Sequence, residues 1–549
     1  MRNYCTRCKD ALKNRAWLVA VLLVMLWTTT PAKADSRIIV RTTLGLQGLQ
    51  QLCNTIPLPI CSVVGSLGDP LNQLFLLNSP LDANIILDIL RSLPGIIDAE
   101  VDQLLSLVGG LNSVTTPPAA LSQSTLLSYY NSKVWNGYVT QPAAQIVRVA
   151  AAQHQFNLAG SGIVADIDTG VDPNHPAFAG VLLQGYDFTR NQSGASELND
   201  LSPTDFPYLP PPCAPANCPP ANVNQESAAI LEGWAATILD TNPNYAAFGH
   251  GTMVMGVIHL VAPKARLLPL KAFSSAGTGY LSDILRAIYY ANQNGANIIN
   301  MSFDLMTSSK ELSSALDQAN KSGIICAASA GNDGKEEVVY PAALQTDVMG
   351  VASTSDLDTR SSFSNYGDKV VWVAAPGEAI VTTYPFSTYA AGWGTSFSAP
   401  FVSGGAALLL NLKPGTNEPH AAADVAHAVY VGPDMGSGRL DLVRALSAAR
   451  GDFSISVAPS SVAIHRGTSQ KMTVTVTALQ GFTGTVNLSV SGLPTQTSWA
   501  FSPASITGAG TSVLTLQIGQ SAPTGTYKLT IRGKSGSLVH SAQVILTIR

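Results

Sequence analysis

The octapeptide IVADIDTG, residues 163–170, is a short apolar run that contains two acidic residues and ends in glycine. Five residues, 163–167, are too few for a buried helix and predict a buried strand, as do the apolar runs 298–301 and 324–328. Between the first two runs, apolar residues recur at helical spacing at Leu281, Ile284, Leu285, Ile288 and Tyr289. Strands that alternate with helices predict a parallel sheet with helices on both faces. We therefore expect a large α/β domain over residues 141–450.

The composition sets the number of domains and excludes some partners. At about 150 residues per domain, 549 residues predict three to four domains. Only 12% of the residues are charged, about half the usual quarter. The formal net charge of −4 offers no positive surface for nucleic acid or for an acidic membrane. We therefore expect neither of these partners.

The first 34 residues have the pattern of a secretory signal peptide. Five basic residues precede the apolar run 16–27, and Ala32-Lys33-Ala34 follows it. The run has 12 residues, within the 7–15 of a signal and short of the roughly 20 that span a bilayer. We expect cleavage before Asp35 and a secreted, extracellular protein with no membrane attachment afterwards. An uncleaved anchor is the alternative.

Two regions flank the predicted α/β domain. Residues 35–105 alternate strand, helix, strand, helix and strand, which predicts a small α+β module, and the Ser-, Thr-, Leu- and Pro-rich residues 106–140 predict a linker. Residues 451–549 contain only short alternating runs, such as 472–477, separated by Gly and Pro turns. This spacing predicts a β-sandwich of about seven strands.

The chain has seven cysteines, and an exported protein meets an oxidising compartment. Cys5 and Cys8 leave with the signal. The remaining residues predict two local disulfides, Cys53–Cys61 and Cys213–Cys218, and leave Cys326 as a buried free thiol in an apolar run.

Three short stretches place reactive side chains next to glycine. They are Asp168-Thr169-Gly170 after a strand, Gly249-His250-Gly251-Thr252 at a helix start, and Gly394-Thr395-Ser396-Phe397-Ser398-Ala399-Pro400 at another. Each alone is weak, because such Asp, His and Ser residues are more often turn, loop or capping residues. Together they supply a carboxylate, an imidazole and a hydroxyl, the set that a serine nucleophile needs.

The three stretches, in the order Asp, His, Ser, closely resemble the signatures of the subtilisin-like serine proteases over about 300 residues. The resemblance implies that Ser396 is the nucleophile, His250 the general base and Asp168 the residue that orients it. It also implies that Asn332, in Ser329-Ala330-Gly331-Asn332, donates a hydrogen bond to the oxyanion. Two other interpretations fit less well. The acid-adapted relatives of this family have Glu and Asp where this sequence has His250 and Asn332. A metal site made of Asp168, Asp172 and His175 is the second alternative.

The sequence departs from the family pattern at four positions. Met253, Phe401 and Trp393 replace His, His and a small residue, and we expect them to change packing only. Asp304 follows Met301-Ser302-Phe303, where other members of the family have a Gly-containing edge that pairs with the substrate backbone. An Asp side chain there would narrow the substrate-binding groove or favour a basic substrate residue. The Pro-rich insertion 191–244 is expected to rim the active site.

The resemblance extends to the whole architecture. It implies that residues 35–105 are a ferredoxin-like inhibitory prodomain, removed by a cut between about Leu105 and Ala143, and that the substrates are proteins or peptides. No organic cofactor is required; structural calcium is common in the family, but no acidic loop here identifies a site. We expect a monomer. The alternatives are a catalytically inactive scaffold and a cell-surface polysaccharide binder using Trp499 and Phe501, side chains for which core packing is the simpler expectation.

Overall fold

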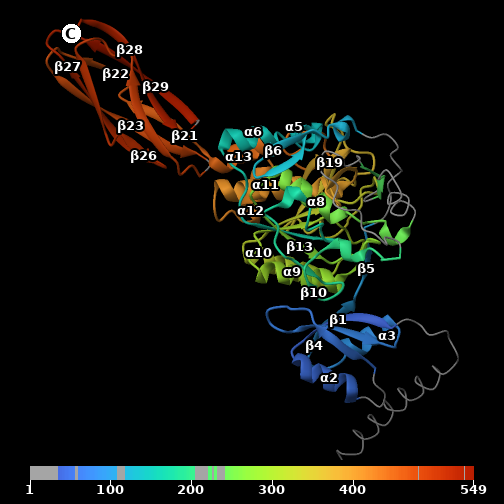
Figure 1. Cartoon of the computed structure of the whole chain (residues 1–549). Helices are drawn as coiled ribbons and strands as arrows, with labels where there is room; N and C mark the ends of the chain where they lie inside the picture. Colours follow the sequence, from blue (N-terminus) through green and yellow to red (C-terminus); the bar gives the residue numbers. More distant parts are fainter. Residues whose placement is uncertain are drawn as a thin grey trace, which may run out of the picture. The chain divides into compact units, whose positions relative to one another are not determined.

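The computed structural model describes residues 35–55, 60–107, 118–204, 221–224, 228–230, 242–479, 481–536 and 538–549. It divides into two compact units, residues up to Asp102 and residues from Gln103 onward (Figure 1). Within the described ranges, no helix combines the length and the apolar character needed to cross a bilayer. The predicted signal peptide lies outside these ranges.

The first unit is a four-stranded antiparallel sheet with two helices. The chain runs β1 (Ser36–Thr42), α2 (Gly45–Thr55), β2 (Ser62–Ser66), β3 (Leu74–Ser79), α3 (Ala83–Arg91) and β4 (Ile96–Val101). The sheet order β2-β3-β1-β4 and the β-α-β-β-α-β sequence are those of a ferredoxin-like module. The strand β2 was not predicted, because it is short and its pairing with β3 shifts between Val63 and Gly65.

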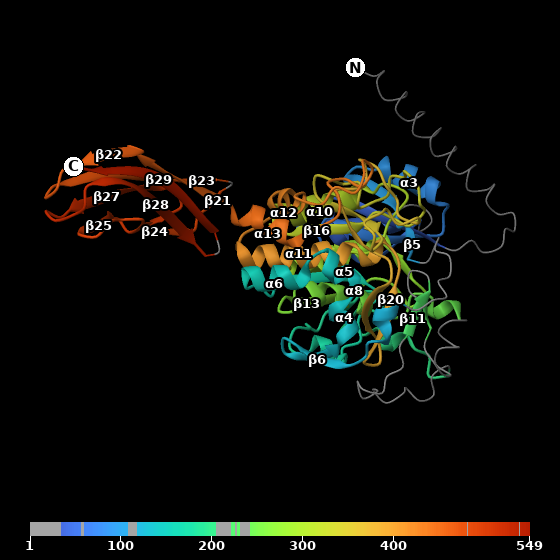
Figure 2. The ribbon, with the colours of Figure 1, turned by 90° about the horizontal axis from the view of Figure 1, so that it is seen from above.

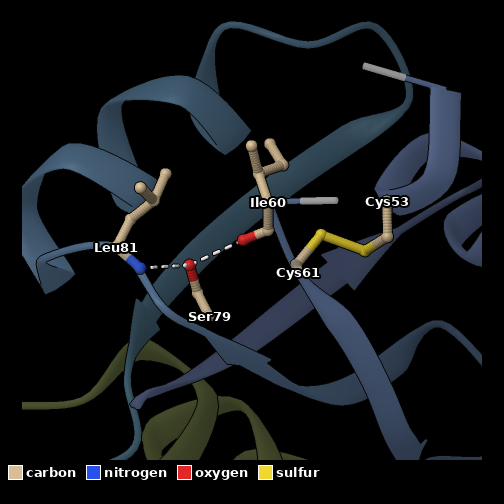
Figure 3. Close-up of a disulfide and its surroundings, with 5 residues drawn as sticks. All are labelled: Cys53, Ile60, Cys61, Ser79 and Leu81. Atoms are coloured by element: carbon tan, nitrogen blue, oxygen red, sulfur yellow. Dashed lines mark hydrogen bonds between the residues drawn. A yellow bond between two sulfur atoms is a disulfide. The ribbon is translucent and has the colours of Figure 1, made fainter. Parts of the chain in front are cut away.

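Apolar side chains from the sheet and both helices, among them Ile38, Leu49, Phe75 and Ile86, form the core of this unit. The predicted disulfide Cys53–Cys61 is formed beside this core and joins the end of α2 to the residue before β2 (Figure 3). Next to it, the Ser79 hydroxyl donates to the Ile60 carbonyl at 2.7 Å and accepts from the Leu81 amide at 3.1 Å (Figure 3). The other predicted pair, Cys213 and Cys218, lies outside the described residues. Cys326 is buried and free, as expected.

The second unit contains the predicted α/β domain, and the three predicted strands are present. Its sheet has the order β10-β9-β13-β8-β15-β16-β17-β18, and every pair from β9 to β18 is parallel. The strands are β8 (Ile163–Asp168), β9 (Tyr186–Asp187), β10 (Gln192–Ser193), β13 (Arg266–Lys271), β15 (Ile298–Met301), β16 (Ile325–Ser329), β17 (Met349–Thr354) and β18 (Val373–Pro376). Nearly all their residues are buried, as expected of strands covered on both faces.

Helices cover both faces of this sheet. Figure 1 shows α9 (Leu281–Gln293) and α10 (Lys310–Lys321) on one side of β13, and α8 (His250–Val261) and α11 (Ala399–Leu412) on the other. Every residue of α8 is buried, whereas α9 and α10 each keep a polar outer face. The two inner helices therefore hold their first residues, His250 and Ala399, rigidly against the sheet. The smaller helices are α4 (Asn136–Thr140), α5 (Pro142–Ile146), α6 (Val149–Phe156), α12 (Glu418–Val425) and α13 (Leu442–Arg450).

The prediction of a linker over residues 106–140 is wrong for residues 118–140. The hairpin of β6 (Leu126–Tyr129) and β7 (Ser132–Trp135) and the helix α4 pack into the main core. Trp135 stacks on Tyr389 with ring centroids 4.9 Å apart, and the Tyr138 hydroxyl donates to the Gly256 carbonyl at 2.7 Å. The segment lacks periodicity because single large aromatic side chains, and not one continuous face, make its contacts.

Residues 452–549 form two packed antiparallel sheets, coloured orange to red in Figure 2. One has the order β21-β23-β27-β25 and the other β22-β29-β28-β24-β26, in which only the β22–β29 pair is parallel. The described strands are β21 (Asp452–Ala458), β22 (Ser461–Ile464), β23 (Ser469–Leu479), β24 (Thr485–Ser491), β25 (Thr497–Ser502), β26 (Ser505–Thr507), β27 (Gly510–Ile518), β28 (Gly525–Ser535) and β29 (Leu538–Ile548). Alternate residues of β23 and β27 enter the core, as the alternating sequence predicts.

The expectation that Trp499 and Phe501 both pack inward holds for Phe501 only. Phe501 is in the core, whereas Trp499 is 45% exposed and contacts the Phe501 ring edge-to-face at 5.5 Å. Both residues lie on β25, which is an edge strand of its sheet.

Candidate active site

Asp168 is the last residue of β8 and lies at the carboxyl end of the parallel sheet, where such sheets usually place functional groups. Its side chain is buried. The backbone N–H of Thr169 donates to its Oδ1 at 2.6 Å. The carboxylate is thus fixed by the turn that follows the strand.

His250 is the first residue of α8, and a close backbone approach brings it to Asp168. A Cβ atom on Gly251 would lie 2.0 Å from the Gly170 carbonyl oxygen, so this contact requires glycine. His250 Nδ1 lies 2.7 and 2.8 Å from the two carboxylate oxygens of Asp168. His250 Nε2 is buried and has no hydrogen-bond partner in the described structure. A proton on Nδ1 therefore leaves Nε2 free to accept one.

Ser396 lies in the short 3₁₀ turn Thr395–Phe397 that leads into α11. Its hydroxyl donates to the Ser302 carbonyl at 3.2 Å, and the Ser302 hydroxyl donates to the Ser396 carbonyl at 2.9 Å. The next residue, Phe397, lies against His250 with ring centroids 5.8 Å apart. Asp168 and His250 are therefore joined by a hydrogen bond. Ser396 precedes the ring that packs on His250, and its hydroxyl points to the Ser302 carbonyl.

Asn332 follows β16 and is held against the same turn. Its Oδ1 accepts from the Thr395 N–H at 2.8 Å and from the Thr395 hydroxyl at 3.0 Å. A Cβ atom on Gly394 would lie 3.6 Å from Asn332 Nδ2. The amide nitrogen of Asn332 thus lies next to Gly394, which precedes Ser396 by two positions in the chain.

A cavity of about 260 Å³ opens beside Ser396. Its walls are the residues after β15 and those around the end of β16, together with Asn332, Ser106 and Leu107. Asp304, singled out from the sequence, lies in this wall.

One strand of the chain itself lies beside this cavity. β5 (Leu104–Ser106) pairs antiparallel with β14 (Thr278–Tyr280), and the Leu107 N–H donates to the Gly277 carbonyl at 2.8 Å. β14 therefore presents an edge that binds an extended peptide backbone, and that edge leads to Ser396.

Glu197 supports the site but was not predicted. Its buried carboxylate accepts from the Gly249 N–H at 2.8 Å and the Thr169 hydroxyl at 3.2 Å, and it also bonds the Thr252 hydroxyl. It therefore joins the turn after Asp168 to the start of α8. Burial raises the pKa of Glu197 to about 8. Glu197 lies in the predicted insertion 191–244, most of which is outside the described residues, and no motif marked it.

Two further buried charged groups flank Asp168. The Lys271 ammonium donates to the Thr169 and Phe273 carbonyls and to Asp200, each at 2.7 Å. Asp166, two residues before Asp168, accepts from the Asn300 amide at 2.9 Å. Burial and the charge of Asp168 raise the pKa of Asp166 well above its usual range.

The departures at Met253, Phe401 and Trp393 affect packing. Met253 and Phe401 are fully buried in the main core, and Trp393 packs against it.

A metal site at Asp168, Asp172 and His175 is not formed. Asp172 accepts from the Asn174 and Phe386 amides, and His175 Nδ1 accepts from the Ala177 amide. Among the described residues, no group of three His, Cys, Asp or Glu side chains is arranged to hold a metal ion. These polar residues therefore fix loops.

Comparisons with known proteins agree with this geometry. A model of the subtilase family matches residues 160–433. Thermitase of Thermoactinomyces vulgaris is 34% identical over 266 residues, which are 48% of this chain and 81% of thermitase. Subtilisin DY of Bacillus licheniformis is 36% identical, and the alignment covers 33% of this chain and 70% of subtilisin DY. Subtilisin E of Bacillus subtilis is 38% identical, and the alignment covers 32% of this chain and 49% of subtilisin E.

Proposed function

Because this chain belongs to the subtilase family and is a serine endopeptidase of the subtilisin type, we propose that Ser396, His250, Asp168 and Asn332 carry out its reaction. The observation that carries the proposal is the buried Asp168–His250 hydrogen bond, which uses Nδ1 and leaves Nε2 without a hydrogen-bond partner among the described residues. An imidazole in this state is a proton acceptor within a dry site.

The proposed reaction begins when the Ser396 hydroxyl leaves the Ser302 carbonyl and turns to His250. Ser396 Oγ attacks the scissile carbonyl while its proton passes to His250 Nε2, and Asp168 stabilises the imidazolium. The Asn332 amide and the Ser396 backbone N–H donate to the oxyanion of the tetrahedral intermediate. The C–N bond then breaks, and His250 gives its proton to the leaving amine.

Water completes the cycle. It loses a proton to His250 Nε2 and attacks the acyl-enzyme carbonyl, and the ester bond to Ser396 breaks as the proton returns to the serine oxygen. These steps need no organic cofactor. Calcium would act, if at all, as a structural ion.

We also propose that the protein is made as a secreted precursor, inhibited by its own amino-terminal segment, and that it acts as a monomer. The support for inhibition is β5, which pairs with β14 and is followed by Leu107, a residue that lines the cavity beside Ser396. Residues 118–140 belong to the core of the second unit and must stay with it. The maturation cut is therefore expected within residues 108–117, which lie outside the described structure.

Labelling with a fluorophosphonate probe tests the mechanism. We expect covalent labelling of the processed protein, loss of labelling in Ser396→Ala, and unchanged labelling in the matched control Ser398→Ala. Processed protein that is not labelled would instead support the inactive scaffold.

The precursor proposal has its own test. Amino-terminal sequencing of secreted protein is expected to give a start between residues 109 and 118, and Ser396→Ala is expected to accumulate uncut precursor. A mature protein that begins at Asp35 would contradict it.

A further inference from the structure

The cavity beside Ser396 has an acidic wall. Asp304 and Asp333 both line it, on the chain segments that follow β15 and β16. A Cβ atom on Gly331 would lie 3.2 Å from Asp304 Oδ2. The Asp304 carboxylate therefore lies against the turn that follows β16.

This carboxylate has no hydrogen-bond or ion-pair partner among the residues that the structure describes, although it is largely enclosed. Burial, followed by the negative charges of Asp333 and Glu337, raises the pKa of Asp304 to about 6. Glu337 Oε2 is itself buried without a hydrogen bond. Three carboxylates thus lie together with no donor assigned to Asp304.

Among the described residues, no Lys, Arg or His side chain forms an ion pair with Asp304, Asp333 or Glu337. Within the described ranges, no group of three His, Cys, Asp or Glu side chains is arranged to hold a metal ion. An unpaired buried carboxylate is unfavourable, so a cation that enters the cavity gains more than it would in water.

The cavity is placed to receive a substrate side chain next to the scissile bond. Ser396 and Asn332 are part of its wall, and β5 approaches it from the amino-terminal side through Leu107. A peptide that follows the path of β5 would bring to the cavity the residue whose carbonyl meets Ser396.

We propose that this enzyme, when it cleaves other chains, prefers arginine or lysine at the residue that contributes the scissile carbonyl, because the Asp304 carboxylate binds the cationic side chain. Residues 108–117 contain neither arginine nor lysine, so the cut of the precursor would depend instead on the pairing of β5 with β14. The inference rests on the proposed function, since it assigns the substrate class of the same site. Asp304 is a specificity residue here and takes no part in the proton transfers.

Three quenched peptides that differ only at that residue test the preference. Arginine is compared with citrulline, which has the same shape without the charge, and with leucine. For the processed protein, we expect kcat/KM for arginine to exceed that for citrulline at least tenfold. In Asp304→Asn the ratio should fall to within about threefold, with cleavage of the leucine peptide undiminished.

Asp317→Asn is the matched control, because Asp317 lies on α10, pairs with Lys321 and does not line the cavity. It should retain the arginine preference. An arginine-to-citrulline ratio near one in the unaltered enzyme, or a ratio that survives in Asp304→Asn, would overturn the inference. Fluorophosphonate labelling of the same samples separates the two proposals: labelled enzyme without a charge preference refutes only the role of Asp304, whereas unlabelled enzyme refutes the serine mechanism.

Discussion

At the scale of single residues, the position of Asn332 explains how an amide donor is kept ready before a substrate arrives. Thr395 binds its oxygen through two hydrogen bonds, so the side chain cannot rotate freely. A donor that is already oriented stabilises developing charge without paying for reorganisation during the reaction.

Asn332→Ala is therefore expected to lower kcat by about 10²–10³-fold, the loss known for one such donor in a subtilisin, with little change in KM. Steady-state kinetics on a peptide substrate measures both constants. Asn320→Ala, a change of the same kind on α10, is the control and should leave kcat unchanged. An increase in KM with kcat unchanged would show instead that Asn332 helps to bind the substrate in its ground state.

The preference for arginine over citrulline is expected to depend on pH through the carboxyl group of Asp304. Its pKa of about 6 is raised by burial and by Asp333 and Glu337, so it is neutral at low pH and becomes charged as the pH rises through about 6. The ratio of kcat/KM for the arginine and citrulline peptides should accordingly increase between pH 5 and 7. Using a ratio removes any effect of pH that is common to both peptides. A flat ratio in the unaltered enzyme would contradict the prediction, and Asp304→Asn should give one.

At the scale of elements, Glu197 shows how a turn can be attached to a helix through one buried carboxyl group. Its folded-state pKa of about 8 lies above the value of about 4.3 for an unfolded chain. The folded protein therefore binds more protons between these values. The stability that this group contributes is complete below about pH 4 and is lost as the pH rises through about 8.

Glu197→Gln should flatten this part of the stability curve, because glutamine does not titrate. Urea unfolding at pH 5, 6, 7 and 8, in a Ser396→Ala background that prevents self-digestion, measures the difference in unfolding free energy. The difference should move in favour of the variant as the pH rises. A constant difference across the series would show that Glu197 is already ionised in the folded state.

The sequence predicted those elements whose signal is continuous. The strands 163–167, 298–301 and 324–328, the helix of Leu281 to Tyr289 and the alternating strands of the sandwich are all present, because each buries a regular face. The sites at Asp168 and His250 could be located because glycine permits the close contacts beside them.

Other features depend on contacts that a local pattern does not record. The sequence predicts a linker over residues 118–140 because their burial comes from single aromatic rings such as Trp135, whose partner Tyr389 is far away in sequence. Glu197 was missed because its three partners come from two distant motifs. The alternating pattern predicts that Trp499 lies on the core-facing side of its strand. The pattern does not reveal that this strand lies at the edge of its sheet.

At the scale of the whole molecule, the disulfide belongs to the first unit only. It closes a loop with a sequence separation of 8, for which chain entropy predicts about 2–3 kcal/mol of stabilisation. If this unit is removed at maturation, the disulfide helps the precursor and has no effect on the mature enzyme.

The double variant Cys53→Ser, Cys61→Ser is therefore expected to reduce the yield of processed protein while leaving the melting temperature and kcat of the mature enzyme unchanged. Differential scanning calorimetry of mature samples and quantification of secreted protein measure the two effects. A lower melting temperature of the mature enzyme would show that the first unit is retained.

The edge of β14 has one more consequence. Because it meets its partner through backbone N–H and carbonyl groups, a target must offer several consecutive residues whose own backbone groups are unpaired. A compact globular protein has to give up part of its native pairing before it can enter. The equilibrium for local unfolding of the target, as much as the identity of any residue, would then determine how quickly it is degraded. Unfolded chains and long surface loops would therefore be cleaved first.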